Sequence, residues 1–160
     1  MGSTIILMAL VVILNSDVKT PEFNYDYGAS EDYSSFLFNT KIQDLSNDYV
    51  TYLTEHGYIN NTRNTIMEQI DEFYYNERLS GGVYTYAGNF TMNVTESMIS
   101  KKYGYSYRIQ DGGNNVVLYA RRMDTLPAAR VVMVSRKITF LQVDSMTFFG
   151  PSIAELKIWI

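Results

Sequence analysis

The chain has 160 residues, of which 46% are hydrophobic and 19% are charged, and it carries a net charge of −4. These values are typical of one folded domain with a core, with or without an anchor, and they exclude wholesale disorder. The absence of cysteine excludes disulfides, iron–sulfur clusters, thiolate zinc sites and cysteine nucleophiles, and the single histidine, His56, excludes multi-histidine metal sites. We therefore expect no cofactor.

Charge is distributed unevenly along the chain. Residues 1–80 carry 4 basic and 12 acidic side chains, whereas residues 81–160 carry 9 basic and 5 acidic ones. Such asymmetry could favour docking of the acidic half of one subunit on the basic half of a neighbour. The simpler interpretation keeps the asymmetry inside the monomer, as a helical layer that faces a sheet. Neither half is basic enough to indicate nucleic-acid binding.

An unbroken apolar run occupies residues 5–14. As a helix it would span only about 15 Å, roughly half of a hydrocarbon core. The run has no positive n-region and no small-x-small cleavage site, and the residue at position 6 does not fit the myristoylation pattern. We predict a truncated or processed hydrophobic stem, and the alternative is an ordinary buried strand or helix. The residues assigned to this membrane or assembly stem are Ile5, Ile6, Leu7, Leu10, Val11, Ile13 and Leu14.

The pattern predicts three regions: a stem at 1–14, a polar linker at 15–30 and a head domain at 31–160. From residue 31 on, apolar residues recur at spacings of three and four, which predicts a helix that Ser30 caps and that Gly57 ends. A turn at 60–64 leads into a second predicted helix that closes at Gly81-Gly82. Both apolar stripes are interpreted as core.

After residue 82 the apolar period changes to two, which predicts strands. The predicted strands are 83–86, 90–94, 103–110, 116–121, 130–143 and 153–160, with a short helix at 95–102. The segment 111–114 is typical of a hairpin turn, and Gly150-Pro151 predicts another turn. The predicted fold class is therefore α+β, with a stem helix, two helices and a mostly antiparallel sheet.

Few residues of the sequence are candidates for catalysis. Glu68 and Glu72 stand four apart on a predicted helix, but a glycosidase pair normally comes from different elements across a cleft. Together with Asp71 and Glu77 they are interpreted as a solvated helix face. His56 lies at a predicted helix C-terminus without a serine and an acid that could be named as partners. The sequence therefore predicts no enzyme activity.

Three Asn-x-Thr sequons begin at Asn60, Asn89 and Asn93. We expect all three in turns or half-exposed strand segments, where glycan acceptors lie. Together with the apolar run, they favour an exported glycoprotein.

Short motifs follow one another along the body of the chain. They are GYINNT at 57–62, IMEQIDEF at 66–73, NVTE at 93–96, YGYSYRI at 103–109, VMVSRKI at 132–138 and AELKIW at 154–159. Their order over residues 35–160 resembles archaeal surface proteins with class III signal peptides, the type IV pilin-like and archaellin-like group. The resemblance implies an N-terminal helix that packs into a filament core or lies in the membrane, with a glycosylated β-rich head outside. The chain departs from the pattern in lacking a Lys/Arg-Gly processing site and in having a stem of half the usual length.

The sequence thus predicts a non-enzymatic pilin-like cell-surface subunit, whether major, minor or pseudopilin, anchored or assembled through residues 5–14. Its expected partners are further copies or other pilin-like subunits, and membrane lipid through the stem. The 14 tyrosines, with large apolar rings and polar tips, would supply contacts. The alternative is a membrane-anchored binding or sensing module that does not polymerise, and a secreted enzyme is the third option.

Overall fold

The computed structural model describes residues 24–123, 131–142, 146 and 148–160, so the predicted stem lies outside the described residues. Among the described residues there are four α-helices and a four-stranded antiparallel sheet, which confirms the α+β class but not the expected number of helices. No described helix has the length and apolar character needed to cross a membrane. The elements are α1 (Asn24–Asn39), the 3-10 helix η1 (Ile42–Asp44), α2 (Asp48–Glu55), α3 (Ile66–Leu79), α4 (Thr85–Thr95), β1 (Gly104–Asp111), β2 (Asn114–Arg121), β3 (Val131–Gln142) and β4 (Phe148–Trp159).

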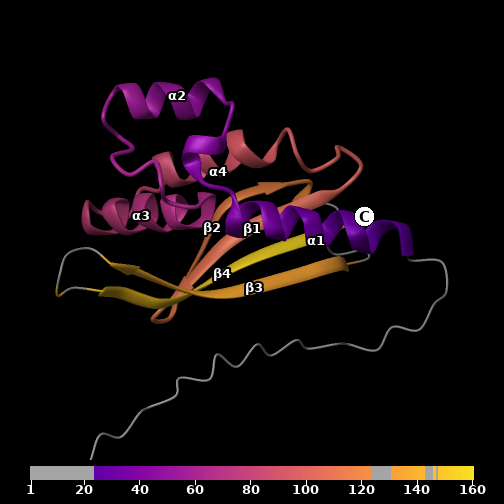
Figure 1. The fold of residues 1–160 in the computed structure, drawn as a ribbon. Coiled ribbons are helices and arrows are strands. Elements are labelled where there is room, and N and C mark those ends of the chain that lie inside the picture. The colour runs from indigo at the N-terminus through magenta and orange to yellow at the C-terminus, as the bar shows by residue number, and fades with distance from the viewer. Residues whose placement is uncertain (1–23, 124–130, 143–145, 147) are drawn as a thin grey trace, which may run out of the picture.

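The sheet has the strand order β2-β1-β4-β3, and every neighbouring pair is antiparallel. The helices cover one face of it, as Figure 1 shows. Helices α1 and α3 contact β3, α4 contacts β2, and α2 packs on α4 as the outermost element. No helix of the described residues covers the opposite face of the sheet.

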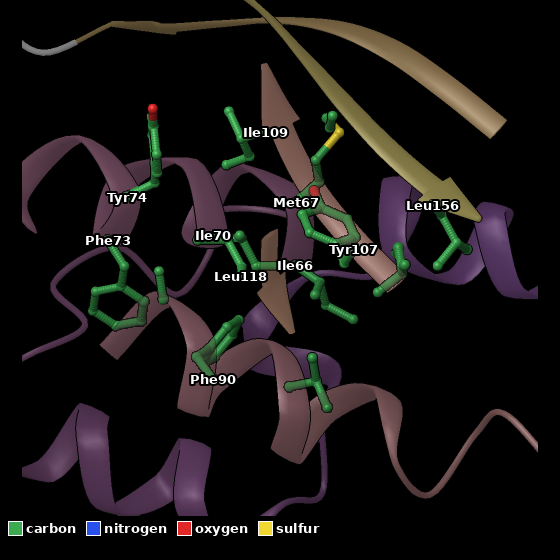
Figure 2. Packing of buried hydrophobic residues seen from close by; sticks show 14 of the residues in the cluster. Ile66, Met67, Ile70, Phe73, Tyr74, Phe90, Tyr107, Ile109, Leu118 and Leu156 are labelled. Atoms are coloured by element: carbon green, nitrogen blue, oxygen red, sulfur yellow. The ribbon is translucent and has the colours of Figure 1, made fainter. Parts of the chain in front are cut away.

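The core lies between the helices and one face of the sheet. On β1, Tyr105, Tyr107 and Ile109 point toward the helices, because side chains alternate along a strand. Tyr107 is paired with Leu156 of β4, both are fully buried, and Figure 2 shows Tyr107 near Met67 and Ile70 of α3. Each fully buried side chain of this size contributes roughly 1.5–3 kcal/mol relative to the exposed state. This face therefore holds the layers together.

The segment 83–94 was predicted as two strands, and this prediction is wrong. Ala87, Phe90, Thr91 and Val94 are buried at spacings of three, one and three, which is a helical stripe within α4. The carboxylate of Glu77 completes its N-terminus by accepting hydrogen bonds from the backbone N–H groups of residues 86 and 87, at 2.7 and 2.9 Å. Tertiary contacts thus override the strand preference of its aromatic and β-branched residues.

The single long helix predicted from residue 31 is divided into α1 and α2 by the 3-10 turn. Helix α1 begins at Asn24, inside the stretch 15–30, so Ser30 lies within the helix and does not cap it. Asn47 caps α2, because its side-chain oxygen accepts hydrogen bonds from the backbone N–H groups of residues 49 and 50 at 3.0 and 3.1 Å. Gly57 follows α2 with φ of +74°, as expected of a helix-ending glycine.

The later elements follow the sequence predictions more closely. The hairpin at 111–114 and the predicted strands at 103–110, 116–121 and 130–143 are confirmed over their described residues. Residue 95 ends α4, and residues 96–102 form turns and a bend and not the predicted helix. Gly150-Pro151 is not a turn but a cis peptide inside β4, which therefore begins at Phe148.

Candidate interaction surfaces

The predicted acidic pair on α3 serves local structure. Glu68 forms a capping box with Thr65, whose backbone N–H donates to the Glu68 carboxylate at 2.7 Å. Glu72 accepts a hydrogen bond from Asn64 at 2.9 Å. Burial raises the pKa of Glu72, and the hydrogen bonds from its neighbours reduce this rise. Among the described residues, no group of three or more His, Cys, Asp or Glu side chains could hold a metal ion.

Asp71 was predicted on a solvated face, and this prediction is wrong. Its relative exposure is 2%, and it faces the sheet beside Thr139, Lys137 and Tyr107. Burial raises the pKa of Asp71 to about 7, while the hydrogen bond from Thr139 and the charge of Lys137 act in the opposite direction. The covered face of the sheet therefore contains a carboxyl group that can titrate near neutral pH.

The three sequons occupy two kinds of structure. Asn60 lies exposed in the turn between α2 and α3, as predicted. Asn89 and Asn93 lie on helix α4 and not in turns or strands, so that part of the prediction is wrong. The Thr95 hydroxyl of the last sequon is buried and donates back to the carbonyl of residue 91 at 2.6 Å.

His56 caps the C-terminal end of α2. Its Nδ1 lies 2.8 Å from the backbone oxygen of Tyr52, and the two rings are 4.1 Å apart between centroids. The side chain is exposed. These contacts are those of a helix-terminal residue.

An acidic surface lies on the outermost part of the helical layer. Asp44 of η1 and Asp48 and Glu55 of α2 are exposed, and we call these three residues the acidic surface. Asp48, Tyr52 and Glu55 follow each other at spacings of four and three, which puts them on one face of α2. Tyr52 is 47% exposed and adds an aromatic ring between the two carboxylates.

The face of the sheet without helices is called the open face. Strand pairing places Arg108 beside Glu155, and Glu155 beside Arg136. Glu155 is only 2% exposed, because both arginines lie over it, with Nε–Oε distances of 2.8 and 2.5 Å. Lys157 belongs to the same face. Among the described side chains, three cations thus meet one carboxylate there.

Apolar side chains surround these charges. Val117, Val134 and Ile138 are 46%, 43% and 59% exposed and flank the charged row on β2 and β3. At one end of the open face, the hairpin 111–114, Ile138, Pro151 and Ile153 line a cavity of about 450 Å³. The open face is therefore mixed in character, with a basic centre and an apolar border, as interaction surfaces often are.

Trp159 lies at the other end of the open face, where β4 is paired with the start of β1. Its indole lies over Gly104, where an added Cβ atom would be 2.1 Å from the indole nitrogen. That nitrogen donates to the backbone oxygen of Arg122 at 3.2 Å. Only glycine fits at position 104, so this close approach depends on a residue whose role the sequence did not indicate.

The opposite charges of the two halves of the chain are only partly paired between the layers. Arg78 of α3 pairs with Asp111 of β1, and Arg121 of β2 pairs with Glu96 at 3.0 Å. The cations of the open face instead point away from the helical layer. The monomer therefore keeps an acidic outer surface on one side and a basic one on the other.

A comparison of the chain with models of known protein families, with curated proteins and with solved structures found no significant match.

Proposed function

We propose that this chain is a non-enzymatic, pilin-like cell-surface subunit that is anchored or assembled through its apolar residues 5–14. The observation that carries the proposal is the short separation in sequence between this run and a helix that packs into the head. Helix α1 begins ten residues after the run ends and packs against α3 and β3, with Leu37 buried in the core. Helix α1 is thus part of the packed head, and the apolar run precedes it in the chain.

The mechanism would be packing and not catalysis. Apolar stems that bury against each other or in lipid gain about 25 cal/mol per Å² of apolar area removed from water. The head would supply the surfaces that meet further copies or other pilin-like subunits outside the cell. Glu68 and Glu72, the strongest candidates for an enzyme, are engaged in the capping box and in the hydrogen bond with Asn64.

Cell fractionation of the full chain in its own host tests the stem. The double substitution Leu7→Arg and Val11→Arg places two charges in the run, and we expect it to move the protein from the membrane or filament fraction to the soluble fraction. A matched control adds the same charges at the exposed apolar positions Leu79 and Val83. Equal distribution of the wild-type chain and both variants would contradict the proposal.

A second candidate, a membrane-anchored binding module that does not polymerise, is favoured by one observation. A cavity of about 290 Å³ between α3 and the end of β3 is lined by several amide side chains and an aromatic ring, which is a polar lining suited to a small hydroxylated ligand. Its lining residues are Asn61, Asn64, Glu72, Tyr75, Asn76, Leu141 and Gln142. Electron microscopy of the surface fraction separates the two: filaments that contain the chain support a subunit, and dispersed particles support the module.

A further inference from the structure

We propose that the open face of one copy binds the acidic surface of the next copy, so that the heads join head to tail. This inference rests on the proposed function, since it names the partner and the surfaces of a subunit that assembles. The open face contributes Arg108, Arg136 and Lys157, and the acidic surface contributes Asp44, Asp48 and Glu55.

The two surfaces lie on opposite sides of the head. In Figure 1, α2 is the element farthest from the sheet, and the open face is the side of the sheet that points away from the helices. A contact between two different surfaces of identical subunits is heterologous, and when the surfaces face opposite directions it repeats without closing. The arrangement therefore favours a row of heads over a closed dimer.

The chemistry of the two surfaces is complementary. Two carboxylates flank the ring of Tyr52 on one face of α2, and on β3 two apolar side chains, Val134 and Ile138, flank Arg136. Packing the ring against the apolar border brings the carboxylates to the cations of the open face. A tyrosine ring beside a guanidinium also gains from the cation–π interaction. The carboxylate of Glu155 remains paired with Arg108 and Arg136 of the same subunit, so it does not oppose the contact.

The size of the open face indicates how strong the contact can be. Two strands of 8 residues and two of 12, about 4.8 Å apart and rising about 3.3 Å per residue, present roughly 600 Å². A stable interface of standard size buries about 800 Å² on each partner. The open face thus supports a reversible contact that is effective where stems already concentrate the subunits.

Sedimentation of the full-length chain in a non-ionic detergent, over a range of concentrations and at low and high salt, tests the contact. One variant, Arg136→Glu with Lys157→Glu, makes the open face acidic, and a second, Asp48→Lys with Glu55→Lys, makes the acidic surface basic. We expect each variant alone to associate at least tenfold more weakly than the wild-type chain, because like charges then meet. An equimolar mixture should associate again, since every contact between the two variants is complementary. Association of the wild-type chain should weaken at high salt.

Two controls separate charge from folding. The substitution Arg63→Glu reverses an exposed charge of the helical layer outside the acidic surface and should leave association unchanged. Lys157→Glu alone keeps both arginines on Glu155, so it tests the open face even where the double variant folds poorly. Thermal unfolding of each variant checks the fold.

Other outcomes would overturn the inference. Undiminished association of the Asp48→Lys, Glu55→Lys variant would mean that the open face pairs with itself. A chain that is monomeric at all concentrations, but binds vesicles of anionic lipid until Arg136 and Lys157 are reversed, would identify a lipid surface as the occupant. Association in detergent does not depend on the cellular location, so failure here and failure of the fractionation test are distinguishable.

Discussion

The two faces of the sheet are built from the same strands but have opposite characters. Along β4, Ala154, Leu156 and Ile158 are buried under the helices, while the alternate positions carry Glu155 and Lys157 on the open face. Because the side-chain period of a strand is two, one strand can place apolar and charged residues on separate sides. The covered face therefore holds the head together, and the open face is the side on which we propose the contact between copies.

The largest expected effect is a core truncation on the covered face. Replacing Leu156 with Ala should lower the free energy of unfolding by about 4 kcal/mol, because a fully buried leucine leaves a cavity. Replacing its neighbour Lys157 with Ala should change it by less than about 0.5 kcal/mol. Urea unfolding of both variants measures the difference, and equal losses would contradict the assignment of the two faces.

A second prediction concerns Asp71, whose pKa is raised to about 7 in the folded head. An unfolded aspartate titrates near about 3.9, so between about pH 4 and pH 7 the folded state keeps a proton that the unfolded state has lost. Stability should therefore fall as the pH rises through this window, by at most about 4 kcal/mol. In the Asp71→Asn variant this fall should be absent. Unfolding free energies at several pH values measure it, and identical pH dependence of the two proteins would refute the prediction.

A third prediction concerns the link between the layers. Arg121 donates to the backbone oxygens of residues 99, 100 and 103 at 2.9, 2.8 and 3.1 Å and pairs with Glu96. Replacing Arg121 with Ala should cost about 2–3 kcal/mol, because three carbonyls and a carboxylate each lose one hydrogen-bond donor. The exposed Arg63 offers a matched control, and Arg63→Ala should be nearly neutral. Thermal unfolding compares them, and a neutral Arg121→Ala would mean that other contacts hold this segment.

The smallest stability effect is expected on the open face. Ile138 is 59% exposed, so Ile138→Ser should change the free energy of unfolding by less than about 0.5 kcal/mol. The same change should weaken association of the full chain severalfold, because it removes part of the apolar border. A large loss of stability would show that Ile138 belongs to the core, and unchanged association would exclude it from the contact.

The sequence predicted the elements that local patterns specify and missed those that depend on distant contacts. The hairpin at 111–114 and the strands around it were predicted because turn residues and alternation are local signals. Helix α4 was missed, since its start depends on the carboxylate of Glu77, eight residues before the helix begins. Asp71 was misplaced because an apolar stripe does not reveal that a carboxylate lies within it.

The positions of the open face and the acidic surface could not be predicted from the sequence for a related reason. The uneven charge of the two halves was visible in the sequence. The face of the sheet on which the charged side chains lie, however, depends on strand register. Only the pairing of Arg108, Glu155 and Arg136 shows that these cations lie on the face without helices. The outward position of α2 likewise follows from its packing on α4.

Intermolecular cross-linking can show whether the open face of one copy binds the acidic surface of the next copy. Full-length chain with natural nitrogen and chain labelled with ¹⁵N would be mixed in equal amounts in detergent and treated with a zero-length reagent that joins amines to carboxylates. Mass spectrometry then identifies peptides that contain one labelled and one unlabelled partner. We expect mixed pairs between Lys157 and Asp44, Asp48 or Glu55. Mixed pairs that join Lys157 to carboxylates elsewhere, or cross-links only within single copies, would contradict it.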